Sequence, residues 1–230
     1  KLISKIDRPK PDTLQRKKIS RFEKNERTTL FSQDIFNKII ESINPFDLVA
    51  YGELEPFYYS LIKYLKIKRN QILLTAGADQ GIKLLFETFL QKEDEVINYS
   101  PNYAMYSVYT KMYGGNEITK YFNDKLSIDI DDLINSVNSK TKFIIISNPG
   151  HNGVIISKEK IISLLNATSK TKTLVLVDEA YVDFTNISMI KYISTFKNLV
   201  IVRTMSKGFG LASIRIGYII AWKELIDEVY

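Results

Sequence analysis

The sequence predicts an α/β protein with a mostly parallel sheet and helices on both faces. From residue 71 onward, short apolar runs alternate with stretches of helical periodicity, and parallel strands need such helical crossovers between them. Three of the runs are continuously apolar, which is typical of strands that are buried on both faces. These runs are Phe143–Ile146, Leu174–Val177 and Leu199–Val202.

The first helix is expected after Ser32, which suits an N-cap, because apolar residues recur at helical spacing from Ile35 to Ile43. Further helices are expected over 56–65, 77–89, 102–113, 130–137, 158–167 and 189–194, and one more from residue 222. Further strands are expected over 72–75, 95–98, 116–121 and 214–220. Residues 1–29 have no such pattern and predict an arm. We therefore divide the chain into 1–50, the arm and first helix, and 51–230, a large domain.

Composition excludes several kinds of site. The chain has 230 residues, of which 45% are hydrophobic, enough to bury one sizeable core. It contains no cysteine and a single histidine, His151, so disulfides, thiolate metal sites and multi-histidine metal sites are excluded, and no metal is predicted. No apolar run reaches the roughly 18 residues of a membrane-spanning helix, and no signal-peptide pattern occurs. We expect a cytoplasmic protein with no membrane partner.

The net charge of +6 comes from the N-terminal arm. Residues 1–27 contain ten Lys or Arg against four Asp or Glu, whereas residues 28–230 contain 22 of each. An arm that binds nucleic acid or an anionic surface is one interpretation. A solvated leader is the interpretation that we favour, so no nucleic-acid partner is predicted.

The candidate nucleophile lies in a glycine-rich turn between two apolar runs. Lys207 is flanked by Ser206, Gly208 and Gly210, and Arg215 follows eight residues later. Burial among small residues and a neighbouring cation both favour the neutral amine, which is the form that attacks a carbonyl carbon to give a Schiff base. Most lysines are surface residues, so this turn alone is weak evidence.

Polar groups also follow the other two buried strands. The run Asp178-Glu-Ala-Tyr181 comes after Leu174–Val177, and Asn148-Pro-Gly-His-Asn-Gly153 comes after Phe143–Ile146. Open α/β sheets hold ligands at the carboxyl ends of their strands. We therefore expect these residues to form one site with Lys207.

Taken in order, these motifs resemble those of the fold-type-I pyridoxal-phosphate enzymes, in particular histidinol-phosphate aminotransferases and the related amino-acid-phosphate decarboxylases. The resemblance extends from about Tyr51 to the C-terminus. It implies the large domain of that fold, pyridoxal 5′-phosphate as cofactor, an amino donor and an amino acceptor as substrates, and a homodimer. Members of the family continue into a small C-terminal domain, which we expect to be missing from this chain.

The resemblance implies roles around the ring of the cofactor. Lys207 would carry the Schiff base, and Asp178, at the end of a buried strand, would keep the ring nitrogen protonated so that the ring can accept electrons. Tyr181 and Asn152 would hydrogen-bond the phenolic oxygen. The chain lacks the second proline and the threonine that are usual in the family's asparagine motif, so Asn148 competes with Asn152 for this role.

For the cofactor phosphate, the implied ligands are a helix N-terminus and two side chains. Gly77, Ala78 and Asp79 lie at a strand-to-helix turn, whose N–H groups and dipole favour an anion. Ser206 can donate its hydroxyl, and Arg215 can donate from its guanidinium.

Three tyrosines complete the expected site. Tyr103 matches the aromatic residue that stacks on the cofactor ring in the family. Tyr106, three residues later, is the competing tyrosine, which we expect in the core. Tyr51 resembles the tyrosine that a partner subunit lends to the cofactor phosphate, and an ordinary surface tyrosine is the alternative at this position.

We therefore predict a pyridoxal-phosphate-dependent aminotransferase of class I/II that acts on a small, phosphorylated amine or amino acid. A decarboxylase of a phosphorylated amino acid is the alternative within the family, since it would use the same motifs. A regulatory domain that binds the cofactor without catalysis is the alternative from another class. The intact set of Lys207, Asp178, Tyr181 and Arg215 argues against that alternative.

Overall fold

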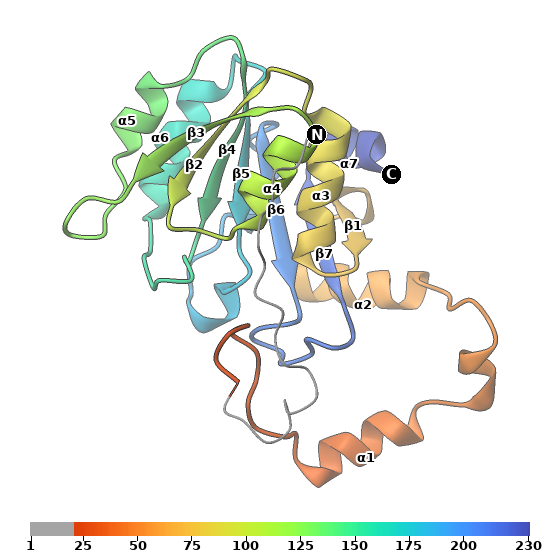
Figure 1. The fold of residues 1–230 in the computed structure, drawn as a ribbon. Helices are drawn as coiled ribbons and strands as arrows, with labels where there is room; N and C mark the ends of the chain where they lie inside the picture. The colour runs from red at the N-terminus through yellow and green to blue at the C-terminus, as the bar shows by residue number, and fades with distance from the viewer. Residues whose placement is uncertain (1–20) are drawn as a thin grey trace. The chain divides into compact units, whose positions relative to one another are not determined.

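The computed structural model describes residues 21–230, and its main feature is a seven-stranded sheet (Figure 1). The strands lie in the order β1-β7-β6-β5-β4-β2-β3. Their bounds are β1 Ile72–Thr75, β2 Glu95–Ser100, β3 Asn116–Tyr121, β4 Thr141–Ser147, β5 Leu174–Asp178, β6 Leu199–Thr204 and β7 Gly217–Ala221. Every strand predicted from the sequence is therefore present.

One strand runs against the others. β3, β2, β4, β5 and β6 pair in parallel along the sheet, whereas β7 is antiparallel to both of its neighbours, β6 and β1. β7 can return beside β6 without a crossover helix because an antiparallel pair needs only a turn. The turn is residues 205–216, which contain Lys207 and Arg215. The predicted mostly parallel sheet is confirmed.

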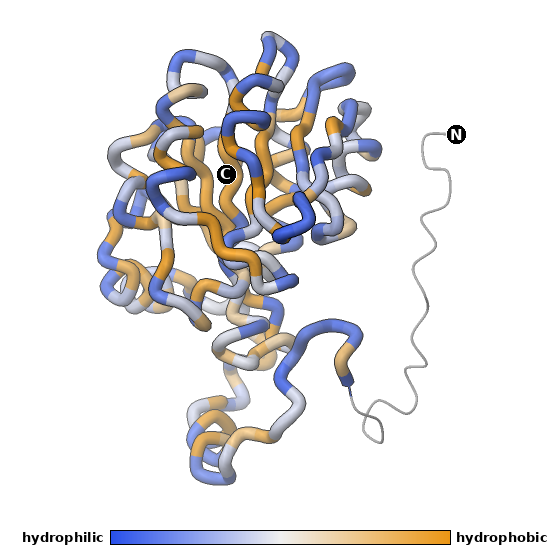
Figure 2. Tube along the Cα trace, turned by 90° about the vertical axis from the view of Figure 1, so that its left-hand side faces the viewer, coloured by the Kyte–Doolittle hydropathy of each residue, from blue (hydrophilic) through white to orange (hydrophobic). Residues whose placement is uncertain are grey.

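The helices that cover the sheet are α3 Ala78–Phe89, α4 Met105–Met112, α5 Ile130–Asn135, α6 Lys158–Thr168 and α7 Lys223–Val229. α3 and α4 lie on one face and α6 on the other (Figure 1). Side chains alternate between the faces of a strand, so Phe143 in β4 joins the core under α3, where its ring stacks on Phe86 at 4.9 Å. Figure 2 shows hydrophobic strands inside this part of the chain. Helices on both faces are thus confirmed.

Two helical predictions differ in detail. The helix expected over 102–113 begins at Met105, because residues before it form a turn in which Asn102 Oδ1 accepts a bond from the Tyr103 N–H at 2.8 Å. The segment expected over 189–194 is one 3-10 turn, Ile190–Tyr192, whose first N–H donates to the Ser188 hydroxyl at 3.0 Å. Short polar side chains compete with helical bonds at both places.

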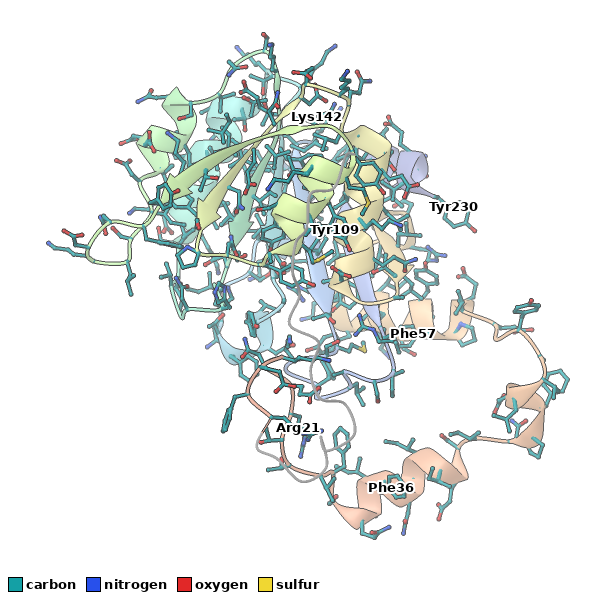
Figure 3. All side chains as sticks on the ribbon, viewed as in Figure 1. Arg21, Phe36, Phe57, Tyr109, Lys142 and Tyr230 are labelled. Atoms are coloured by element: carbon teal, nitrogen blue, oxygen red, sulfur yellow. The ribbon has the colours of Figure 1, made fainter. Side chains whose placement is uncertain are left out.

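Residues 70–230 form one compact unit, and the described residues before them form another. The second contains α1 Gln33–Glu41, a 3-10 turn Pro45–Leu48 and α2 Glu55–Leu65. Ser32 caps α1 as predicted, since its hydroxyl accepts from the Ile35 N–H at 3.4 Å. Phe36, labelled in Figure 3, belongs to this helix. The basic arm predicted over 1–29 falls mostly outside the described residues.

None of the helices within residues 21–230 has the length and apolar character needed to span a bilayer. The longest of these helices, α3, has 12 residues. The division of the chain at residue 50 stays a prediction.

Candidate active site

The predicted site residues of the larger unit gather at one edge of the sheet, where β1, β4, β5 and β6 end. The strand register aligns the ends: Ser147 pairs with Asp178, and both Thr75 and Thr204 pair with Gly217 at the start of β7. The loops that follow these strands carry the three motifs found in the sequence. We call this the carboxyl edge.

Asp178 is the buried acid of the carboxyl edge. It is 6% exposed, and its Oδ1 accepts from the Ala180 N–H at 2.9 Å while its Oδ2 accepts from the Tyr106 hydroxyl at 2.6 Å. Burial raises the pKa of Asp178, and the bonds from Tyr106 and Ala180 and the charge of Lys207 oppose that rise. A cationic ring nitrogen beside the carboxylate would also offset the cost of burial, so the site suits the predicted role.

Lys207 follows β6 in a turn at the carboxyl edge and is half-buried. Its Nζ lies 5.9 Å from the centroid of the Tyr181 ring, and its charge reaches Asp178. Gly208 gives this turn its close packing, since a Cβ at that position would lie 2.3 Å from the Cβ of Asp183. The structure therefore brings Lys207, Asp178 and Tyr181 together, although 29 residues separate the first two.

A second group of donors surrounds the N-terminus of α3. Gly77 is the N-cap of this helix, and no side chain caps it, so its first N–H groups can face an anion. The Arg215 guanidinium lies beside this end: Nη2 donates to the Ala76 carbonyl at 3.2 Å, and Nη1 lies 3.4 Å from Ser206 Oγ. These groups are the predicted phosphate ligands, and they converge.

Two glycines allow this convergence. Gly77 has φ +84°, and a Cβ there would lie 2.7 Å from Arg215 Nη2. A Cβ on Gly217 would lie 2.4 Å from the backbone carbon of Gly77 and 2.6 Å from the Ala78 nitrogen. The groups around the N-terminus of α3, namely its first N–H groups, Ser206 and Arg215, are called the phosphate cradle below. A side chain at either glycine would fill the space that this cradle needs. This close fit of backbone, hydroxyl and guanidinium is what a phosphate ligand requires.

Gly217→Ala should consequently weaken phosphate binding. The new methyl group would push the start of α3 away from β7, and overpacking of this kind costs about 1–3 kcal/mol. We expect a lower urea midpoint and a loss of affinity for pyridoxal phosphate of about tenfold or more. Gly115→Ala is the matched control, because a Cβ there would also be crowded, 2.9 Å from Leu90 Cδ2, but Gly115 lies in the turn before β3. Equal affinities in the two variants would contradict the role of the Gly77–Gly217 contact.

Tyr103 stands at the mouth of the cradle. Its hydroxyl donates to Asp79 Oδ1 at 2.9 Å, and its ring meets the Tyr106 ring edge-on, with centroids 5.6 Å apart. Tyr103 is 42% exposed, so part of this residue is accessible to a ligand. Asp79 thus lies in the first turn of α3 as predicted, with its carboxylate bonded to this tyrosine.

The two candidate asparagines differ in what they bind. Asn148 is 1% exposed, and its side chain makes two bonds to the backbone of Ile156, at 2.9 and 3.0 Å. Asn152 is exposed, accepts from the Val154 N–H at 3.2 Å, and lines a pocket with Ser147. Since the loop uses both polar atoms of Asn148, Asn152 remains the better candidate for a cofactor ligand.

Sequence reasoning missed a buried ion pair behind the carboxyl edge. Glu179 and Arg203 are 1% and 8% exposed, with Arg203 Nη2 at 2.7 Å from Glu179 Oε2. The pKa of Arg203 is raised: burial opposes its charge, but the Glu179 carboxylate and Tyr218 together outweigh burial. The pair ties the turn after β5 to β6, the strand that leads to Lys207. An arginine directly after the apolar run of β6 was the available signal, since a buried charge needs a partner.

Tyr106 and Ser147 are the other residues that sequence reasoning missed. Tyr106 is buried, as expected, but its hydroxyl contacts Asp178. Ser147, the last residue of β4, lies 3.0 Å from that hydroxyl.

Tyr51, the predicted ligand from a partner subunit, belongs to the other unit, where it is fully exposed.

This fold and site define a class of protein. Residues 44–230 match the family described as aminotransferase class I and II, and the chain belongs to that family. Among individual relatives, the histidinol-phosphate aminotransferase of Buchnera aphidicola subsp. Schizaphis graminum is 41% identical over 187 residues, which are 78% of this chain and 52% of that protein.

Solved structures agree with this assignment. The histidinol-phosphate aminotransferase from Clostridium acetobutylicum superposes with a TM-score of 0.74 at 30% identity, over 86% of this chain and 59% of that one. The L-threonine-O-3-phosphate decarboxylase from Porphyromonas gingivalis gives 0.64 at 27% identity, over 76% and 54%. The chain therefore spans little more than half the length of these relatives. The predicted family and large-domain fold are confirmed.

Proposed function

We propose that this chain forms the cofactor-binding part of a pyridoxal-phosphate-dependent aminotransferase whose substrate is a phosphorylated amine related to histidinol phosphate. The observation that carries the proposal is the convergence of Lys207, Asp178 and the α3 cradle at the carboxyl edge. A lysine, a buried carboxylate and a phosphate cradle are the three parts that this cofactor needs. Relatives that are histidinol-phosphate aminotransferases, up to 41% identical, support the substrate class.

Each group has a distinct task in this proposal. When bound, the cofactor supplies an electron sink for the bond that breaks at the substrate's α-carbon. Ser206, Arg215 and the N-terminus of α3 hold its phosphate. Asp178 stays ionised against its ring nitrogen, and Tyr103 covers one ring face.

The remaining groups act near the reacting carbon. Lys207 would hold the cofactor covalently through its side-chain amine in the resting enzyme, and a substrate amine would free it. Free Lys207 then acts as the base that moves a proton from the substrate α-carbon. Tyr181 and Asn152 donate to the phenolic oxygen. The 5.9 Å between Lys207 Nζ and the Tyr181 ring supports a shared role for this pair.

Product analysis tests the proposal. The protein is incubated with pyridoxal phosphate, a 2-oxo acid and a panel of phosphorylated and unphosphorylated amines, with Lys207→Ala as control. We expect the 2-oxo acid to become an amino acid, fastest with a phosphorylated donor. Release of carbon dioxide without amino transfer would instead indicate the decarboxylase, the class of the Porphyromonas gingivalis structure. Cofactor binding without either reaction would indicate a non-catalytic binder.

We also propose a cytoplasmic homodimer in which Tyr51 of each chain donates to the cofactor phosphate in the other. A hydrogen bond to a charged group contributes about 1.5–3 kcal/mol, so Tyr51→Phe should weaken cofactor retention by about tenfold or more and leave the covalent chemistry of Lys207 intact. Tyr59→Phe is the matched control, because it removes another exposed tyrosine hydroxyl, on α2. Sedimentation and cofactor dialysis measure the outcome. A monomer that retains cofactor and activity in full would contradict this proposal.

A further inference from the structure

A chain of hydrogen bonds runs from Asp178 into the protein. The Tyr106 hydroxyl is 2.6 Å from Asp178 Oδ2 and 3.0 Å from Ser147 Oγ, and Ser147 Oγ is 2.8 Å from Asn102 Oδ1. Tyr106 is 1% exposed. These residues come from α4, β4, β5 and the turn after β2, so the chain joins four segments at the carboxyl edge.

The far end of the chain is fixed as well. Asn102 Nδ2 donates to Asn98 Oδ1 at 3.2 Å, which sets the orientation of the Asn102 amide and turns its oxygen toward Ser147. That oxygen also accepts from the Tyr103 N–H at 2.8 Å. The chain therefore connects the predicted ring-nitrogen acid, Asp178, to the backbone of the predicted stacking residue, Tyr103.

The direction of each hydrogen bond in this chain depends on whether Asp178 is ionised or neutral. An ionised carboxylate only accepts hydrogen bonds, so the single proton of Tyr106 goes to Asp178 and that of Ser147 goes to Asn102, which leaves no proton between Tyr106 and Ser147. A neutral Asp178 would donate to Tyr106, which would then donate to Ser147. The pKa of Tyr106 lies well above its ordinary value, mainly because the residue is buried and also because of the Asp178 charge. The Tyr106 hydroxyl therefore stays protonated.

We propose that Tyr106 is a positioning residue that holds Asp178 ionised and correctly oriented toward the ring nitrogen of the cofactor. Each carboxylate oxygen accepts from one donor, Tyr106 on Oδ2 and the Ala180 N–H on Oδ1, so the two bonds restrict rotation of the carboxylate. Tyr106 acts through Asp178 and has no direct role toward the substrate. The inference rests on the proposed function, because it concerns the cofactor of that function.

Tyr106→Phe tests this role, since it removes the hydroxyl and keeps the ring. Tyr109→Phe is the matched control: Tyr109, labelled in Figure 3, is also on α4, is 5% exposed and packs edge-on against Phe86. The main measurement is the ¹⁵N resonance of ring-labelled pyridoxal phosphate bound to the protein, which reports protonation of the ring nitrogen. Turnover is measured alongside it.

In Tyr106→Phe, we expect the ¹⁵N resonance to move toward that of neutral pyridine and kcat to fall by about tenfold to a hundredfold, the effect of losing one bond to a charged group, with little change in KM. Tyr109→Phe should leave both unchanged. In an Asp178→Asn background, Tyr106→Phe should cause no further loss, because it acts through Asp178. If Tyr106→Phe does not fold, Ser147→Ala serves as the test: it removes the acceptor that Tyr106 would use beside a neutral Asp178, so the ¹⁵N resonance should remain that of a protonated ring nitrogen.

The possible failures are distinct. A wild-type protein that binds no pyridoxal phosphate would overturn the proposed function, and this inference with it. If the wild-type protein has a protonated ring nitrogen, an unchanged ¹⁵N resonance in Tyr106→Phe would overturn this inference alone. Where Ser147→Ala replaces that variant, a resonance moved toward neutral pyridine would do so. Equal losses in Tyr106→Phe and Tyr109→Phe would also overturn it, since they would indicate a general packing effect.

Discussion

Lys207→Ala should abolish the covalent bond to pyridoxal phosphate and reduce turnover by a factor of at least about 10⁴, because the variant loses the nucleophile and the base together. Noncovalent binding of the cofactor should survive, since Ser206, Arg215 and the N-terminus of α3 are unchanged. The visible absorbance of the bound cofactor measures the first effect and single-turnover kinetics the second.

Two controls separate this role from a loss of charge or of folding. Lys207→Arg keeps a cation and removes the nucleophile, so it should behave like Lys207→Ala. Lys223→Ala removes an exposed lysine that pairs with Asp227 on α7, and it should retain full activity. Turnover close to that of the wild type in Lys207→Ala would disprove the assignment of Lys207, and with it the proposed function.

The sequence allowed the sheet to be predicted because burial leaves a local record. β4, β5 and β6 are covered on both faces, so their residues form continuous apolar runs, and the polar groups that follow them had to meet at the carboxyl edge. The direction of β7 leaves no such record: its run is as apolar as that of a parallel strand, and only the short turn before it limits its pairing. That turn places Arg215 against α3, which the spacing alone did not fix.

The charged residues of the site could be predicted from the sequence, whereas the residues that hydrogen-bond to them could not. Lys207 and Asp178 follow apolar strands, where a charge is conspicuous in the sequence. Tyr106 has the apolar ring of a core residue, and it is indeed buried; its function resides in one hydroxyl, whose partner is 72 residues away. Helical spacing places such a residue on a face but cannot identify the atom that it meets across the sheet.

Asp178→Asn should reduce kcat by about 10²–10⁴, the range over which a positioned proton donor or acceptor acts, and weaken cofactor binding far less. The variant removes the charge that keeps the ring nitrogen protonated and leaves the phosphate cradle intact. Wild-type activity requires ionised Asp178, so it should fall as the pH decreases through the pKa of that group, and the variant should lack this acidic limb. Asp132→Asn, which removes a partly exposed carboxylate on α5 that pairs with Lys120, is the control.

The fold should tolerate Asp178→Asn, so a loss of activity in this variant can be assigned to the lost charge. The oxygen of the new side-chain amide can accept from the Ala180 N–H, while its nitrogen donates to the Tyr106 hydroxyl. Tyr106 is then free to donate to Ser147, and Ser147 still donates to Asn102, so each contact of the chain keeps a donor and an acceptor.

The same substitution also has a predictable effect on stability. Burial raises the pKa of Asp178, so the wild type loses stability as the pH rises through that pKa, whereas the variant does not. The cofactor-free variant should therefore be at least as stable as the wild type at neutral pH, with the difference decreasing at acidic pH. An unchanged rate in this variant would show that another carboxylate serves the ring nitrogen. An unfolded variant would show that Asp178 is structural.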